Sequence, residues 1–327
     1  MEPRIYPPSL AEVEQTNHDC YELLVARTFE GAQRRRVVID TGAEFELIVG
    51  DPGKALILFL PGFQSLTVSL SELIDSTMSK LGPSYSYATF NHLGIEPELP
   101  FDKRLAERSA ELSWQVVSEL LLEEGTRVAG IVGFSLACRL LAHRLADLRA
   151  IRPRLPVVFL CPVIIQPRSA LAFMNTLCRG CDRLNALLPR ANVWRSFNCS
   201  RFMSQFWCNV VGEGARSPFT KPMMRLKLRL TNRFTPWHHL SFSGLSAKRL
   251  PSPSWEGVTI VFGACDRVGA PQLQKQWLFE HSGMTSLQFA SQCHDIEGCS
   301  HVIEQEAPER AAAFIAHAVS GQGQDVR

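Results

Sequence analysis

GIVGFSLACRLL, residues 130–141, places a single serine, Ser135, where an apolar strand pattern gives way to a helix of small and apolar residues. Gly133 precedes this serine by two residues and Ala137 follows it by two. A strand that turns sharply into a helix brings these two positions against neighbouring backbone, which favours small side chains. Such a turn strains the serine and pushes its hydroxyl out of the sheet. Ser135 is therefore the candidate nucleophile, and the N–H of Leu136 at the helix start is a candidate oxyanion donor.

Apolar strand patterns alternate with helical patterns along most of the chain. The expected strands cover residues 35–41, 44–50, 55–60, 85–94, 127–134, 155–165, 257–264 and 285–290, and the expected helices cover residues 103–123, 136–149, 271–281 and 307–319. The first two strands form a hairpin near Gly42. Because later strands alternate with helices, we predict an α/β fold with a mostly parallel central sheet and helices on both faces.

The segment from residue 166 to residue 256, here called the cap segment, interrupts this alternation. It is rich in tryptophan, phenylalanine, methionine and arginine, and we expect a mostly helical insertion. The predicted organisation is an N-terminal arm over residues 1–32, an α/β core over residues 33–165 and 257–327, and a helical cap over residues 166–256.

Two further reactive side chains follow predicted strands. Asp266 comes directly after the strand expected at residues 257–264, and His301 follows the last expected strand. Function in parallel sheets gathers beyond the carboxyl ends of the strands, so we expect both residues to lie near Ser135. His301 would take the serine proton, and Asp266 would orient the imidazole and stabilise its charged form. Asp295 is the alternative acid.

The order serine, aspartate, histidine resembles that of the α/β-hydrolase superfamily. ILFLPGF, residues 57–63, looks like the strand and loop that supply a second oxyanion donor, here the N–H of Phe63. GACDRVGAP, residues 263–271, resembles the acid loop, and GCSHVIEQEAPE, residues 298–309, is similar to the histidine loop. The resemblance departs at Pro61, where the superfamily has histidine, and at Ala137, where it has glycine. It covers nearly the whole chain and implies an α/β-hydrolase fold with a cap.

A weaker resemblance concerns the acyl-carrier-protein thioesterases and acyltransferases of bacterial luminescence. GFSLACRLLAHRL, residues 133–145, and FNHLGIEP, residues 90–97, carry it. Together the two resemblances imply a serine hydrolase or acyltransferase that cleaves an acyl ester or thioester through an acyl-enzyme, and a thioesterase acting on carrier-bound acyl chains is the leading hypothesis. A carboxylesterase or lipase acting on small esters or lipids is one alternative, and a non-catalytic interaction protein on the same fold is another. No cofactor and no metal ion are implied.

Charge is distributed very unevenly along the chain. The cap segment holds fourteen basic and three acidic residues, a net charge of +11, whereas the whole chain has a net charge of only +2. A cap with this charge would place a positive field over the site. We expect an anionic partner: an acyl carrier protein, a coenzyme A thioester or an acidic lipid surface. MMRLKLRL, residues 223–230, alternates basic and apolar residues and is a candidate edge for that contact.

The remaining composition is that of an ordinary globular protein, with 46% hydrophobic and 20% charged residues. No targeting segment and no apolar run long enough to span a membrane is evident, and nothing suggests nucleic-acid binding, so we expect a cytoplasmic protein. The ten cysteines, among them Cys138, Cys161 and Cys265, should then be reduced and mostly buried. Cys178 and Cys181 form a CxxC, but no second pair has zinc-binding spacing, which argues against a zinc site.

Overall fold

Eight strands form one sheet in the computed structural model, which describes residues 3–17, 19–39, 42–62, 65–91, 103–123, 125–166, 168–188, 192–201, 205, 217–231, 234–245 and 255–321. The strands are β1 Gln33–Val38, β2 Glu44–Val49, β3 Ala55–Leu60, β4 Tyr85–Phe90, β5 Val128–Phe134, β6 Val157–Leu160, β7 Val258–Gly263 and β8 Cys293–Ile296. Their order in the sheet is β1-β2-β4-β3-β5-β6-β7-β8. The β1–β2 and β2–β4 pairs are antiparallel, and all other neighbours are parallel. The predicted mostly parallel sheet is confirmed.

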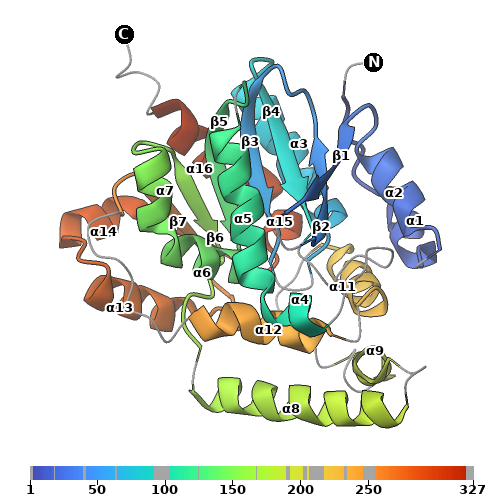
Figure 1. Ribbon diagram of the computed structural model, residues 1–327. Helices are drawn as coiled ribbons and strands as arrows, with labels where there is room; N and C mark the ends of the chain where they lie inside the picture. Colours follow the sequence, from blue (N-terminus) through green and yellow to red (C-terminus); the bar gives the residue numbers. More distant parts are fainter. Residues whose placement is uncertain are drawn as a thin grey trace.

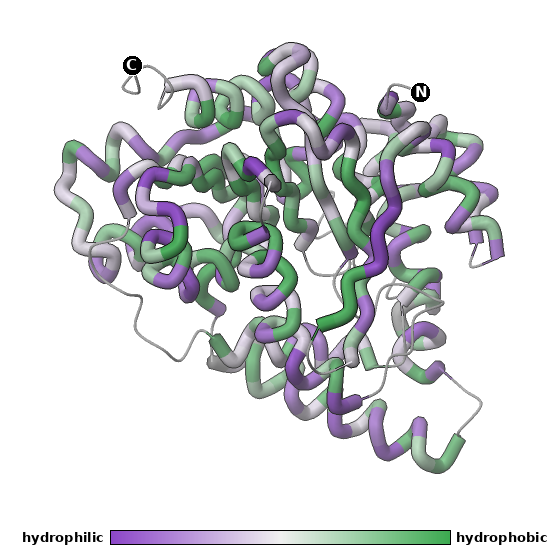
Figure 2. The backbone as a smooth tube through the Cα atoms, turned by 45° about the horizontal axis from the view of Figure 1, so that its top comes forward, coloured by the Kyte–Doolittle hydropathy of each residue, from purple (hydrophilic) through white to green (hydrophobic). Residues whose placement is uncertain are grey.

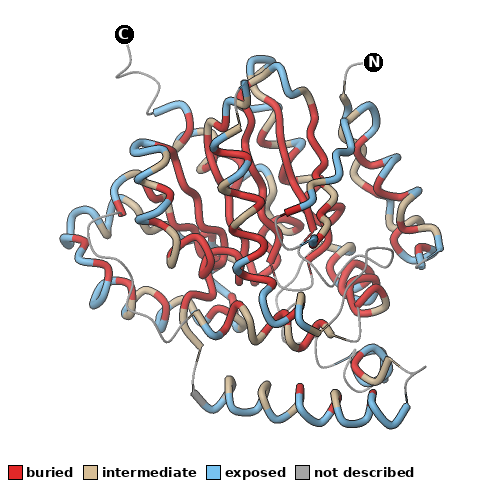
Figure 3. The backbone as a smooth tube through the Cα atoms, viewed as in Figure 1, coloured by how far each residue is buried: buried red, intermediate tan, exposed pale blue. Residues whose placement is uncertain are grey.

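Helices cover both faces of the sheet, so the central strands are buried throughout (Figures 1 and 3). One face packs against α5 Ser109–Leu122, α6 Leu136–His143 and α7 Leu145–Ile151, and the other against α3 Ser71–Leu81 and α16 Pro308–Gly321. Successive side chains of β3 point to opposite faces, so Leu58 lies in the first core and Ile57 in the second. Both are fully buried, which accounts for the uninterrupted apolar run in this strand.

The sheet ends on one side at a charged edge strand. The residues of β1 are exposed except for a partly buried Val37, and the hydrophilic run is purple in Figure 2. Arg35 pairs with Glu123 at the end of α5. An edge strand with charged, outward-pointing side chains resists pairing with other sheets, so the basic triplet here belongs to a solvated sheet edge.

The described part of the cap segment is helical. It consists of α8 Arg168–Leu187, α9 Val193–Asn198, α11 Thr220–Arg229 and α12 Thr235–Gly244. Figure 1 shows these helices beyond the end of the sheet at which α6 begins. α12 packs against α4 Lys103–Glu107, α5, α6 and α8. The N-terminal arm forms α1 Leu10–Gln15 and α2 Tyr21–Thr28, and α1 contacts α11.

Four details differ from the predicted elements. The strand expected over residues 155–165 is shorter, since β6 ends at Leu160. Residues 285–290 were expected to be a strand, but α14 Ser286–Gln292 is a helix that begins with a capping box between Thr285 and Gln288, and β8 follows it. The helix expected over residues 103–123 is divided at Arg108, and the helix expected over 136–149 is divided at Arg144. The other predicted helices, α13 Pro271–His281 and α16, are confirmed, and α15 Ile303–Glu306 precedes α16.

No helix among the described residues is both long and apolar enough to cross a bilayer. The nine described cysteines are free thiols. Cys138 and Cys161 are buried as expected, but Cys265 is exposed, because it lies in the turn that follows β7 rather than in the strand.

Candidate active site

Ser135 lies in a sharp turn between β5 and α6. Its backbone has φ 53° and ψ −113°, a positive-φ conformation that residues with side chains seldom adopt. A Cβ at Gly133 would lie 2.7 Å from Cδ1 of Leu141 and 3.3 Å from the backbone nitrogen of Cys138, so the tight turn favours glycine at this position. Ala137 is fully buried, and its methyl group is accommodated within the turn. The strained strand-to-helix turn expected from the sequence is therefore present.

A continuous chain of polar contacts joins Ser135, His301 and Asp266. Oγ of Ser135 lies 2.8 Å from Nε2 of His301, and Nδ1 of His301 lies 2.8 Å from Oδ2 of Asp266. A carboxylate only accepts hydrogen bonds, so Nδ1 carries the proton and Nε2 accepts from the serine hydroxyl. The three residues are 7%, 6% and 4% exposed, which limits the competition of water for these contacts. The structure thus brings together the three residues that the sequence nominated.

The loop after β7 fixes the carboxylate of Asp266. Its Oδ1 accepts hydrogen bonds from the N–H groups of Val268 and Gly269, both at 2.8 Å, which leaves Oδ2 for the imidazole. Asp295, the alternative acid, does not take part: it lies on β8 and is paired with Lys275 on α13, with the shortest contact at 2.5 Å. In the register of β8 against β7, Asp295 lies opposite Phe262 within the sheet, whereas Asp266 lies in the loop beyond the end of β7.

The loop that carries His301 is held by its own helix and by β7. Oε2 of Glu306 accepts a hydrogen bond from the N–H of Ser300 at 2.6 Å. The end of β7 approaches so closely that a Cβ at Gly263 would lie 2.7 Å from the carbonyl oxygen of Cys299 and would also overlap that of Ser300. Glu306 and Gly263 were not singled out from the sequence, although both belong to motifs that were.

Gly263→Ala is expected to lower the free energy of unfolding by about 1–3 kcal/mol and to displace the loop that carries His301, because the added methyl has no space. Urea unfolding and esterase assays measure the two effects. Gly180→Ala is the matched control: nothing lies within 4 Å of a Cβ at that position of α8, so its stability should stay equal or rise by up to about 1 kcal/mol. Equal stability of the two variants would contradict the packing argument.

Of the two candidate oxyanion donors, the structure describes Leu136 but not Phe63. Leu136 is the first residue of α6, so its N–H is one of those at a helix start that have no acceptor within the helix. Phe63 lies outside the described residues. The preceding residue, Gly62, passes directly against Ser135, because a Cβ there would lie 2.8 Å from Cβ of Ser135.

A buried ion pair ties the cap segment to the histidine loop. Nζ of Lys227 on α11 lies 3.7 Å from Oε1 of Glu304 on α15, and their side chains are 4% and 0% exposed. Burial lowers the pKa of Lys227 and raises that of Glu304. Residues 223–229, part of the stretch expected to be a basic edge, belong to helix α11, which points Lys227 inward.

The ligating side chains near Ser135 are poorly suited to binding a metal ion. In the described part of the chain, the one group of three ligating side chains within 4.8 Å is Cys161, Asp266 and His301. Asp266 and His301 are already hydrogen-bonded to each other. Burial raises the pKa of the Cys161 thiol well above its ordinary value, which disfavours the thiolate form that binds metals. Cys178 and Cys181 lie on the inner face of α8, and both are buried.

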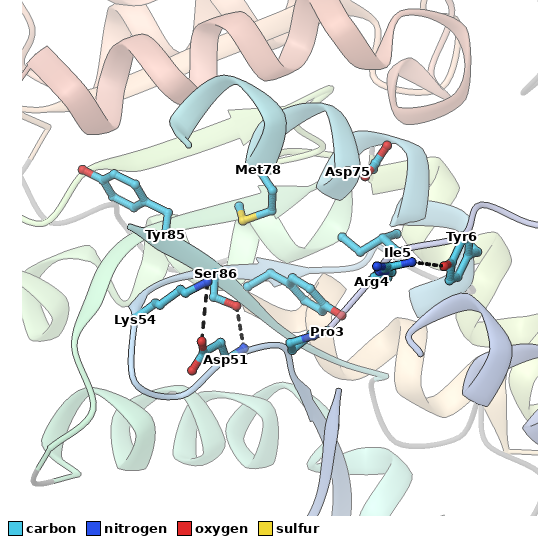
Figure 4. A pocket seen from close by; sticks show the side chains of 11 residues that line it. Pro3, Arg4, Ile5, Tyr6, Asp51, Lys54, Asp75, Met78, Tyr85 and Ser86 are labelled. Carbon is cyan, nitrogen blue, oxygen red and sulfur yellow. Dashed lines mark hydrogen bonds and ion pairs between the residues drawn. The ribbon is translucent and has the colours of Figure 1, made fainter. Parts of the chain in front are cut away.

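A cavity of about 430 Å³ lies at the opposite end of the sheet, near the amino ends of β3 and β4 (Figure 4). It is lined by Pro3, Arg4, Ile5, Tyr6, Asp51, Lys54, Asp75, Met78, Tyr85, Ser86 and Tyr87. Its charged groups partly pair with one another, as Lys54 does with Asp51. In parallel sheets, functional sites usually lie beyond the carboxyl ends of the strands, where Ser135 is found and this cavity is not.

No protein-family model and no curated protein matches the sequence. Solved structures do. A thioesterase domain from the curacin biosynthetic pathway is 13% identical, with a TM-score of 0.57 over 88% of this chain and 99% of that one. An epoxide hydrolase from an endophytic Streptomyces is 16% identical, with a TM-score of 0.56 over 90% and 97%. The 2-hydroxy-6-oxo-6-phenylhexa-2,4-dienoate hydrolase of Rhodococcus sp. strain RHA1 is 14% identical, with a TM-score of 0.54 over 88% and 99%. These enzymes differ in chemistry and share an architecture, so the comparison concerns the fold: this chain has the α/β-hydrolase fold.

Proposed function

We propose that the protein is a serine hydrolase that forms an acyl-enzyme at Ser135. The observation that carries the proposal is the unbroken chain from Ser135 to His301 to Asp266, with both contacts at 2.8 Å, on a strained turn. A serine hydroxyl is a poor nucleophile until a neighbouring base takes its proton, and imidazole is suited to that task near neutral pH.

The geometry supports the following sequence of steps. Oγ of Ser135 attacks the carbonyl carbon of an acyl ester or thioester while its proton moves to Nε2 of His301, and Asp266 stabilises the imidazolium. The N–H of Leu136, together with that of Phe63 as the proposed second donor, binds the oxyanion. The carbon–oxygen or carbon–sulfur bond then breaks and the leaving group takes the proton from His301. Water, activated by the same base, releases the acid and restores the serine; another alcohol or thiol in its place would give acyl transfer.

Covalent labelling with a fluorophosphonate tests this proposal without knowledge of the substrate. The probe phosphonylates an activated serine and releases fluoride. We expect a single adduct, located at Ser135 by peptide mass spectrometry, and no adduct on the heat-unfolded chain. A folded protein that stays unlabelled at millimolar probe would favour the alternative of a non-catalytic interaction protein.

An acyl chain on an acidic carrier protein is our leading substrate. The cap segment, with its net charge of +11, supports an anionic partner. The outermost helix, α8, presents an exposed apolar row. Phe173, Leu184 and Leu187 are 65%, 47% and 76% exposed and recur at helical spacing, whereas Cys178 on the opposite side is buried. Such a row beside basic residues is what an acidic partner with an apolar centre would contact.

Removing the basic residues beside this row tests the carrier hypothesis. Arg179 and Arg183 are exposed on α8. Arg179→Ser/Arg183→Ser is expected to lower kcat/KM for a carrier thioester about tenfold relative to that for a p-nitrophenyl ester, because two favourable charges are lost from the docking surface. The steady-state rates should also depend less on salt than those of the unmodified protein.

Leu287→Ser is the control, because this leucine is 84% exposed on α14, outside the cap segment, and its replacement should leave both rates as they are. An unchanged ratio of the two rates in the double arginine variant, or carrier activity that does not respond to salt, would remove the support for a carrier. The carboxylesterase or lipase alternative would then be preferred.

A further inference from the structure

A buried charged side chain that begins one helical turn after Ser135 has no place in the steps above. Arg139 is on α6, four residues after the nucleophile, and is 0% exposed. Its Nε donates to the carbonyl oxygen of Ile164 at 2.8 Å. Its Nη1 and Nη2 have no hydrogen-bond partner in the described part of the chain. A guanidinium with most of its donors unpaired in the interior is rare, because burying it costs several kcal/mol unless a partner is present.

Among the described residues, no acidic group compensates the charge of Arg139. Burial lowers the pKa of Arg139 to about 9, so the side chain is still mainly protonated at neutral pH. The neighbouring His239, on α12, has its pKa lowered to about 3 by burial and by Arg139, so it stays neutral and supplies no negative charge. Replacing buried charged groups with apolar side chains of similar volume is often neutral or stabilising, so packing alone does not account for the arginine.

The position of Arg139 directs it to the active site. Residues four apart share one face of a helix, and long helical side chains favour rotamers that point back toward its start, so we expect Arg139 to extend toward the end of α6 that carries Ser135. The loop that holds its Nε also touches the nucleophile, because the N–H of Val163 donates to the carbonyl oxygen of Ser135 at 3.2 Å. Gln274 fixes this loop by accepting from the N–H groups of Ile164 and Ile165.

We propose that Arg139 is the specificity-determining residue of the site and binds a carboxylate carried by the acyl group of the substrate. The inference rests on the function proposed for Ser135. A planar guanidinium with its two terminal nitrogens free matches the two oxygens of a carboxylate. The phosphate of a carrier's pantetheine arm fits less well, because the whole arm separates it from the thioester, whereas Arg139 begins one helical turn from the nucleophile.

A matched pair of substrates tests the proposal. The N-acetylcysteamine thioesters of glutaric and pentanoic acid have the same leaving group and chain length and differ in the terminal carboxylate. We expect the unmodified protein to favour the glutaryl thioester, and Arg139→Met to lower the ratio of the two kcat/KM values about 100-fold. Arg139→Lys, which keeps the charge without the planar fork, should lower it about tenfold and serves as the second variant if Arg139→Met fails to fold. A ratio that neither folded variant changes would overturn the proposal.

A binding experiment separates this proposal from the assignment of Ser135. In Ser135→Ala protein, which forms no acyl-enzyme, glutarate should raise the melting temperature, and in Ser135→Ala/Arg139→Met protein it should not. Inorganic phosphate at equal ionic strength is the comparison. Stabilisation by phosphate but not by glutarate, or by glutarate in both proteins, would overturn the proposal. If the unmodified protein cleaves no acyl substrate but glutarate binding still depends on Arg139, the anion site would be retained and the assignment of Ser135 as a hydrolase nucleophile would be discarded.

Discussion

Ser135→Ala is expected to lower kcat/KM for acyl thioesters and esters by at least about 10⁴-fold, because it removes the oxygen atom that forms the acyl-enzyme. The base, the acid and the oxyanion donors remain, so a small residual rate from binding and polarisation should persist. Fluorophosphonate labelling should be lost together with the activity. Rates are best measured with thioesters of several acyl chains, so that the loss does not depend on one choice of substrate.

Two further variants separate loss of chemistry from loss of fold. Ser135→Gly should be as inactive as Ser135→Ala and at least as stable, because glycine adopts φ 53° without the strain that a Cβ brings. Ser291→Ala, at an exposed serine on α14, should keep the activity and the melting temperature of the unmodified protein. Activity of Ser135→Ala within tenfold of the unmodified protein would remove Ser135 from the mechanism.

The sheet was predictable because its strands are buried on both faces. A short, continuous apolar run such as that of β3 is typical of a strand covered on both sides, and the alternation of such runs with helices left little choice of topology. The turn at Ser135 was predictable for a steric reason, since only small residues fit at Gly133 and Ala137. In both places, the residues that form the local pattern are also the ones that packing in the folded protein requires.

The errors arose where local patterns compete. TSLQFA, residues 285–290, has the alternation of a short strand, but Thr285 and Gln288 exchange hydrogen bonds in a capping box that begins a helix. The interruptions at Arg108 and Arg144 fall within apolar patterns that continue on both sides, so periodicity alone did not reveal them. Residues 223–230 alternate basic and apolar side chains, but the pattern does not show that Lys227 is buried and paired with Glu304, which is far away in the sequence.

The candidate site, too, could be predicted from the sequence only in part. Ser135 and His301 stand in motifs whose spacing is informative, but the choice between Asp266 and Asp295 depends on how β8 lies beside β7. Arg139 belongs to the same stretch as the nucleophile, and a lone arginine among apolar helix residues was a usable signal. Its importance depends on complete burial without a partner for its terminal nitrogens in the described part of the chain, which only tertiary structure reveals.

Asp266→Asn is expected to lower kcat/KM by about 10³–10⁴-fold at neutral pH while leaving the fold intact. In the unmodified protein, Oδ1 accepts from the N–H groups of Val268 and Gly269, and Oδ2 accepts from Nδ1 of His301. An asparagine keeps its oxygen toward the two backbone donors and turns its NH₂ toward the imidazole. Nδ1 must then accept, so the ring proton moves to Nε2, which can no longer take the proton of Ser135.

Asp295→Asn distinguishes this tautomer argument from a general effect of charge, since both substitutions remove one negative charge next to the same pair of strands. Asp295 is paired with Lys275 at the surface, and an exposed ion pair contributes less than about 1 kcal/mol to stability, so the variant should keep the activity within about twofold. The nitrogen resonances of His301 provide the direct measurement: Nδ1 should carry the proton in the unmodified protein and in Asp295→Asn, and Nε2 in Asp266→Asn. If Asp266→Asn loses activity while the proton stays on Nδ1, the carboxylate acts mainly through its charge on the imidazolium, and orientation of the ring is the smaller part of its contribution.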